Sequence, residues 1–172
     1  MIKRLLTRAR GQAGFGLIEL IIALMILNIA LLAIIGAFTA SAVSLSRASR
    51  VSTATALANS HLELFRSLDY DEIELNTNDV NTATDATYRT EPGWNTQITD
   101  AACVVASPWW CDASRAATGA DGRQYRIDTY VQAQTASGGR PVKRVTVVIR
   151  DPQALAGRPL ARVASTFDAS FQ

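Results

Sequence analysis

The chain has 172 residues, enough for one modest domain beside an N-terminal helix. Four of its 17 basic residues (Lys3, Arg4, Arg8 and Arg10) lie in the first fourteen positions, which contain no acidic residue. The rest of the chain carries 13 basic residues against 15 acidic ones, so the formal charge of +2 gives no support for nucleic-acid binding.

A long apolar run follows the basic leader. Residues 20–38 are apolar except for Asn28, and as a helix they would extend about 28 Å, close to the hydrocarbon thickness of a bilayer. The excess of positive charge before the run predicts a single-pass membrane helix over residues 15–38, with its N-terminus cytoplasmic and the rest of the chain extracytoplasmic. Glu19 lies inside this helix, where an unpaired carboxylate would cost about 2.5–3.5 kcal/mol. This carboxylate therefore needs a partner.

Two ordinary interpretations account for part of this pattern. A secretory signal peptide would explain the A-x-A cleavage pattern at residues 40–42, but the apolar run exceeds the usual core of about 7–15 residues. A plain single-pass anchor would explain the span, but not the combination of Gly14, Phe15 and Glu19.

Residues 14–20, Gly-Phe-Gly-Leu-Ile-Glu-Leu, closely resemble the class III signal of type IV prepilins and pseudopilins. The resemblance implies removal of residues 1–14 by a prepilin peptidase, which cuts after Gly14, and N-methylation of Phe15. It also implies that the apolar helix first anchors the chain in membrane lipid and later forms the filament core. The implied partners are other pilin subunits, the prepilin peptidase/methylase and an inner-membrane assembly platform.

Cleavage after Gly14 would create a free amine at Phe15, and this amine would give Glu19 a partner of opposite charge. In a staggered bundle of parallel helices, Glu19 of one subunit can face the Phe15 amine of the next. A wrong stagger would leave both charges unpaired, so the pair is better suited to fixing the register than to adding net stability.

The helix is expected to continue out of the membrane, since residues 39–55 are rich in Ala and Ser and contain no Gly or Pro. Over residues 51–68 the spacing predicts an amphipathic helix. Its apolar arc contains Val51, Ala54, Leu57, Ala58, His61, Leu62, Leu64, Phe65 and Leu68. We expect one helix from residue 17 to residue 68, with His61 packed in the core and one of its nitrogens satisfied. Residues 67–71, Ser-Leu-Asp-Tyr-Asp, also resemble minor pilins and minor pseudopilins.

Residues 39–70 are expected to form the exposed continuation of the helix. Residues 71–172 are expected to form a small antiparallel β head. The polar residues 76–87 predict a surface loop, and residues 91–94 a turn. Period-two patterns at residues 125–131 and 145–149 predict an antiparallel hairpin, and residues 162–168 a third strand. The fold class is α+β and pilin-like: a long N-terminal helix packed through its apolar arc on a small antiparallel sheet.

Two cysteines, Cys103 and Cys111, lie in the extracytoplasmic part, where a disulfide is the expected state. Closing so short a loop is worth about 2–3 kcal/mol. Trp109 and Trp110 at its end either form a partner surface or cover an edge of the core. Two cysteines and one histidine supply too few ligands for a metal site, no catalytic motif is present, and no cofactor is expected.

The sequence therefore favours a structural subunit, a minor pilin or pseudopilin of a type IV pilus or of a type II secretion-like filament. The alternative is a single-pass, membrane-anchored binding or adhesion domain that does not polymerise.

Overall fold

The N-terminal third of the described chain is one long helix. The computed structural model describes residues 16–103, 109–135 and 139–169. Helix α1 spans Leu17–Arg66, so the expected helix is confirmed and ends two residues earlier than predicted. The amide of Ser67 bonds to the carbonyl of Leu64 at 3.0 Å, and the Ser67 hydroxyl donates to the same carbonyl at 2.7 Å, which closes the last turn. The chain divides into two units at Leu45 and Ser46, and each is described by itself.

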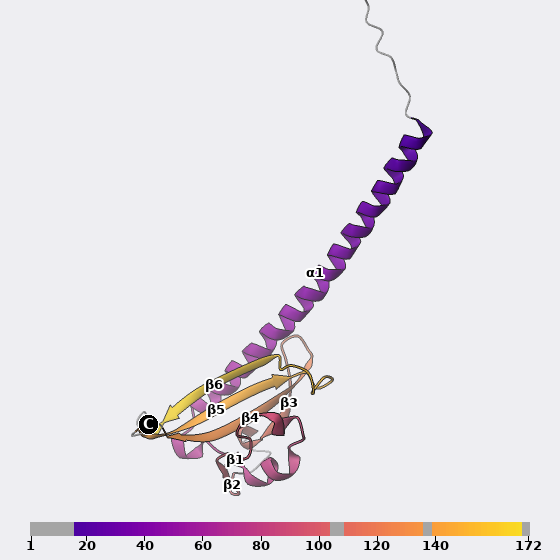
Figure 1. Ribbon diagram of the computed structural model, residues 1–172. Helices are drawn as coiled ribbons and strands as arrows, with labels where there is room; N and C mark the ends of the chain where they lie inside the picture. Colours follow the sequence, from indigo (N-terminus) through magenta and orange to yellow (C-terminus); the bar gives the residue numbers. More distant parts are fainter. Residues whose placement is uncertain (1–15, 104–108, 136–138, 170–172) are drawn as a thin grey trace, which may run out of the picture. The chain divides into compact units, whose positions relative to one another are not determined.

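The second unit, the head, is built on a four-stranded antiparallel sheet in the order β3-β4-β5-β6 (Figure 1). The strands are β3 (Ser114–Thr118), β4 (Gln124–Thr135), β5 (Pro141–Arg150) and β6 (Ala161–Asp168). The expected hairpin is β4–β5, with Thr129 opposite Val147 and Val131 opposite Val145. The expected third strand is β6. Strand β3 was not predicted, because its sequence, SRAAT, has little β propensity.

One face of this sheet packs on the amphipathic half of α1. Ala54, Ala58 and Phe65 are fully buried and share a core with Ile127 and Val145. The predicted apolar arc is therefore confirmed at its centre, whereas Val51 at its edge is 38% exposed. The burial of apolar surface from both elements holds the head together.

The opposite face of the sheet is also covered. Tyr88 lies on this face, and its ring stacks on that of Tyr130 with the centroids 4.3 Å apart. The Tyr88 hydroxyl donates to the carbonyl of Thr129 at 2.6 Å, and the Tyr130 hydroxyl donates to the carbonyl of Tyr88 at 2.9 Å. Burial raises the pKa of both phenols. The tyrosines stay neutral and act as hydrogen-bond donors.

The described part of the chain between α1 and β3 supplies this cover. It contains more regular secondary structure than its polar composition predicts. It contains a parallel pair of short strands, β1 (Leu75–Asn76) and β2 (Thr99–Asp100), a π-helical turn η2 (Asp79–Ala83), and 3-10 turns η1 (Tyr70–Glu72) and η3 (Tyr88–Thr90). A further 3-10 turn, η4, spans Trp109–Cys111. Asn76, Val80 and Thr84 are buried, whereas Asn81 and Thr82 are exposed, so the prediction of a surface loop over residues 76–87 holds for only part of this segment. The expected turn at residues 91–94 is present.

Candidate functional site

The N-terminal part of α1 presents an exposed apolar surface. Leu17 is 77% exposed, Leu32 70% and Phe38 72%, and the large apolar side chains between them are similarly uncovered. Exposed apolar patches of this extent mark a surface that contacts a membrane or another protein. Among the described residues, one helix, α1, is long and apolar enough to cross a membrane, judged by length and composition.

Polar side chains in this part of α1 are satisfied by the helix itself. Asn28 donates to the carbonyl of Leu24 at 2.8 Å, Thr39 to that of Gly36 at 2.9 Å, and Ser41 to that of Ala37 at 2.8 Å. Such internal bonds remove the cost of placing a polar group in hydrocarbon. These residues are therefore compatible with an apolar environment without a partner from outside the helix.

Glu19 differs from these polar residues. It lies in the first turn of α1, where its amide bonds to the carbonyl of Gly16 at 3.0 Å. Within the described part of the chain, no hydrogen bond or ion pair joins its carboxylate to another residue. Gly14 and Phe15, the expected cleavage and methylation positions, lie outside the described residues.

The single histidine belongs to the core between α1 and the sheet. His61 is 2% exposed, its Nε2 lies 3.0 Å from the Thr129 hydroxyl, and its ring packs edge-on against Phe65. Burial, with a smaller contribution from the nearby charge of Arg115, lowers the pKa of His61 to about 4. The packed histidine with one satisfied nitrogen is confirmed, and the imidazole is neutral at physiological pH.

Charged side chains on the opposite face of the sheet form an internal network. Asp128 is fully buried and accepts hydrogen bonds from Arg126 at 2.7 Å, Arg150 at 3.2 Å and Ser114 at 2.7 Å. Arg126 also pairs with Asp85, and this guanidinium lowers the pKa of the Asp85 carboxyl to about 2. Each charge in the network has a partner of opposite sign, which indicates a structural role.

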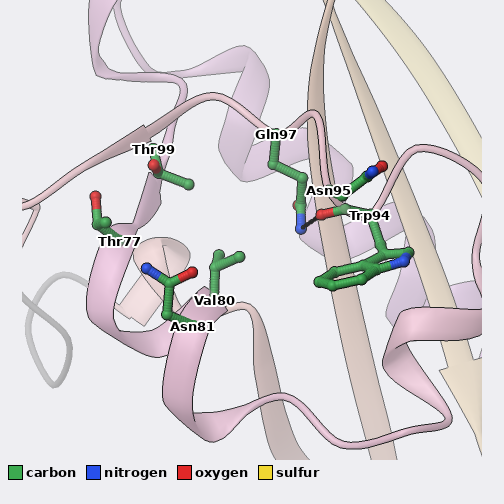
Figure 2. A pocket seen from close by; sticks show the side chains of 7 residues that line it. All are labelled: Thr77, Val80, Asn81, Trp94, Asn95, Gln97 and Thr99. Carbon is green, nitrogen blue, oxygen red and sulfur yellow. Dashed lines mark hydrogen bonds between the residues drawn. The ribbon is translucent and has the colours of Figure 1, made fainter.

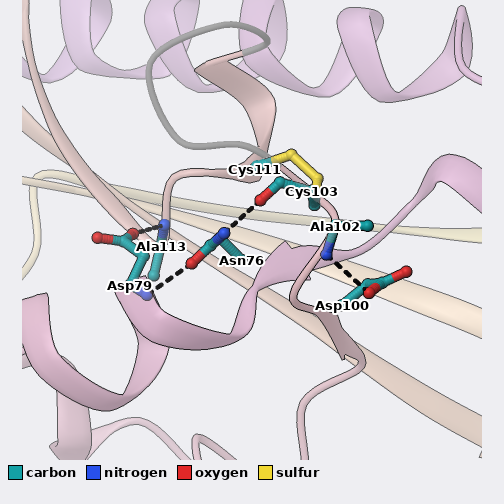
Figure 3. The surroundings of a disulfide bond; sticks show 7 residues. All are labelled: Asn76, Asp79, Asp100, Ala102, Cys103, Cys111 and Ala113. Atoms are coloured by element: carbon teal, nitrogen blue, oxygen red, sulfur yellow. Dashed lines mark hydrogen bonds between the residues drawn. A yellow bond between two sulfur atoms is a disulfide. The ribbon is translucent and has the colours of Figure 1, made fainter.

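Two buried polar residues, Asn76 and Asp79, bond to the chain on either side of the disulfide loop (Figure 3). Cys103 and Cys111 form the expected disulfide, with their Cα atoms 6.0 Å apart. The Asn76 amide donates to the carbonyl of Cys103, and Asn76 Oδ1 accepts from the amide of Asp79 at 2.9 Å. The Asp79 carboxylate in turn accepts from the amide of Ala113, just before β3. Neither Asn76 nor Asp79 was predicted from the sequence to be such an anchor, although a side-chain acceptor three residues before an amide is a known signal of a local turn.

The tryptophan pair is described in part. Trp110 is partly buried and packs against the core, as the alternative interpretation of the pair expected. The side chain of Trp109 lies outside the described residues. No group of three or more His, Cys, Asp or Glu side chains able to hold a metal occurs in the described ranges.

An exposed apolar helix with one carboxylate in its first turn, followed by a small α+β head, fits a pilin-type subunit with a membrane anchor. Residues 9–35 match the family model described as the prokaryotic N-terminal methylation motif, which is the type IV pilin signal. The resemblance identified at residues 14–20 is thereby confirmed. This signal implies other pilin subunits and the prepilin peptidase as partners. Comparisons with curated proteins and with solved structures find no match.

Proposed function

We propose that this chain is a minor pilin or pseudopilin that polymerises through the apolar part of α1. The methylation motif over residues 9–35, which includes the start of a helix whose apolar side chains are exposed, is the observation that supports this function. In the proposed organisation, residues 1–14 are the leader and 15–38 the anchor and later the filament core. Residues 39–70 continue the helix, and residues 71–172 form the head. The leader faces the cytoplasm and the head lies outside the membrane.

Glu19 is the residue proposed to set the assembly register. Cleavage after Gly14 creates an amine at Phe15, and this amine in one subunit compensates the Glu19 carboxylate of its neighbour. The other polar side chains of the apolar segment bond within their own helix, so the carboxylate is the group that gains from a neighbour. A shifted neighbour would leave two uncompensated charges in a medium of low dielectric. This role is structural, and the proposal assigns no catalytic function to the chain.

Processing can be tested by intact-mass and N-terminal analysis of the protein from membranes of cells that contain a prepilin peptidase. The expected N-terminus is methylated Phe15. The Gly14→Val variant should keep its leader, whereas Gly11→Val, a control glycine inside the leader, should be processed normally. A chain that begins at Met1 would support the non-polymerising anchor instead, and one that begins after Ala42 would indicate a secreted domain.

Assembly can be tested separately with Glu19→Leu. We expect normal cleavage but loss of the protein from the filament fraction sheared from cells. Glu63→Leu is the matched control, because Glu63 is an exposed carboxylate of the same helix that pairs with Arg66 one turn away. Incorporation of Glu19→Leu at the level of Glu63→Leu would refute the register role.

A further inference from the structure

A cavity of ≈ 290 Å³ opens in the head between η2 and the segment that leads into β2 (Figure 2). Its volume lies near the lower limit of small-molecule pockets, about 300 Å³, so it suits a single small ring rather than a long chain. Val80 and Trp94 supply apolar surface, and in Figure 2 the indole of Trp94 extends toward Val80. Val80 comes from η2, which is a single π-helical turn. Such turns are uncommon and are often found at functional sites.

The rest of the lining is polar and uncharged. Thr77, Asn81 and Thr99 lie on one side of the pocket in Figure 2, and Asn95 lies across it beside Trp94. In the part of the chain that the structure describes, no hydrogen bond joins any of these four side chains to another residue. Two hydroxyls and two amides are therefore available to a ligand, and together they offer both donors and acceptors.

The backbone that carries the aromatic wall is held in place before any ligand binds. Gln97 donates to the carbonyl of Trp94 at 2.9 Å, and its own oxygen accepts from the Tyr88 hydroxyl at 3.0 Å. Gly93 adopts a φ of 77°, and a Cβ at this position would lie 1.9 Å from the side chain of Gln132. The turn before Trp94 therefore requires glycine. A pre-formed wall lowers the entropy that binding must overcome.

Among the residues that the structure describes, no ionisable side chain lines the pocket. Arg89 lies near it, with its guanidinium 5.3 Å from the centroid of the Trp94 ring, but it is engaged in cation–π contact and donates to Thr84 and to the carbonyl of Asn81 at 3.4 Å. A charged ligand would lose its hydration without gaining a partner of opposite charge in the lining. The lining thus favours a neutral ligand rich in hydroxyl groups.

We propose that this pocket binds a neutral hexopyranose unit of a glycan. One face of such a ring carries C–H groups that are weakly positive and apolar, which matches the negative face of an indole. Its hydroxyls both donate and accept, which matches Asn81, Asn95 and the two threonines. This inference goes beyond the proposed assembly function and does not depend on it, because the pocket lies wholly within the head.

The test uses the full chain in micelles of a detergent without a sugar headgroup. The probes are the methyl pyranosides of glucose, galactose, mannose and N-acetylglucosamine. Binding is followed by saturation-transfer NMR and by titration calorimetry. We expect saturable binding of at least one probe with a Kd on the order of 1 mM, since a single ring makes few contacts.

Pocket variants assign the site. Asn81→Ala and Asn95→Ala each remove an exposed amide, and each should weaken binding about fivefold or more with an unchanged thermal midpoint. Trp94→Ala should abolish binding. Ser60→Ala is the matched control, because Ser60 lines a different cavity, on α1, and its replacement should leave the affinity unchanged. Absence of binding for all four probes, or equal binding by wild type, Asn81→Ala and Asn95→Ala, would overturn the proposal.

Discussion

The buried histidine makes the stability of the head depend on pH in a defined window. His61 has a pKa of about 4 in the folded chain, against 6.5 for an unperturbed histidine. The unfolded chain therefore takes up a proton at a higher pH than the folded chain does. The contribution of the neutral His61 to the free energy of unfolding is fully present above pH 6.5, falls as the pH drops toward 4, and is lost below that value.

The size of this loss of stability follows from the difference between the pKa of His61 in the unfolded chain and its pKa in the folded chain. At about 1.36 kcal/mol for each pKa unit, the difference between 6.5 and about 4 corresponds to roughly 3 kcal/mol of unfolding free energy. Asp85, with its pKa lowered to about 2 by Arg126, loses its contribution only at lower pH. Burial raises the pKa of Glu74, which works in the opposite direction in part of the same window. A comparison with a variant that keeps Glu74 isolates the histidine.

The double variant His61→Leu/Thr129→Val serves as the reference, because it replaces both hydrogen-bonding partners by apolar groups and leaves neither unsatisfied. Denaturant unfolding, followed by near-UV circular dichroism at several pH values between 7.5 and 4, gives the free energy of unfolding of each chain. We expect the wild type to lose about 3 kcal/mol more than the double variant over this range. An equal loss in both chains would refute the assignment of the effect to His61.

Three further predictions concern the head and are checked by the same unfolding measurement. Asp128→Ala removes a fully buried carboxylate from between two arginines, and we expect a loss of about 3–5 kcal/mol; a loss below about 1 kcal/mol would show that the network is solvated. The double variant Cys103→Ser/Cys111→Ser should lose about 2–3 kcal/mol, and reductant should destabilise the wild type equally but leave the variant unchanged. Gly93→Ala and Gly122→Ala both place a side chain at positive φ, but a Cβ at Gly122 would meet nothing within 4 Å. The Gly93 variant should therefore be the less stable of the two, by about 1 kcal/mol or more, and equal stabilities would contradict the predicted clash.

The elements whose side chains follow a simple period were predictable from the sequence. The 3.6-residue spacing of Ala54, Leu62 and Phe65 identified the buried face of α1, and the alternation in β4 and β5 identified the hairpin. Both patterns arise because the apolar side chains on one face of a regular element are buried. The motif at residues 14–20 could also be recognised from the sequence, because the residue types at its few positions are determined by processing chemistry rather than by packing.

The cover on the other face of the sheet was not predictable in the same way. Asn76 and Asp79 are buried through hydrogen bonds to backbone groups of the disulfide loop and of the chain before β3, and their composition resembles that of an exposed loop. The pocket combines η2, the turn before Trp94 and β2, which only the tertiary fold brings together. Arg126 and Asp128 alternate with apolar residues in β4, a pattern that ordinarily indicates a solvent-exposed face, so this pattern did not indicate that the face is covered.

The packing of α1 on a sheet far along the chain sets a time order for maturation. The helix is synthesised first, yet His61 meets its partner on β4 only 68 residues later, and Arg50 pairs with Asp151 across 101 residues. Until β4 and β5 emerge, the face of α1 that contains Phe65 has no sheet to cover it. During that interval the apolar face of α1 within the head is uncovered, so we expect the head to be most prone to aggregation while it is still incomplete.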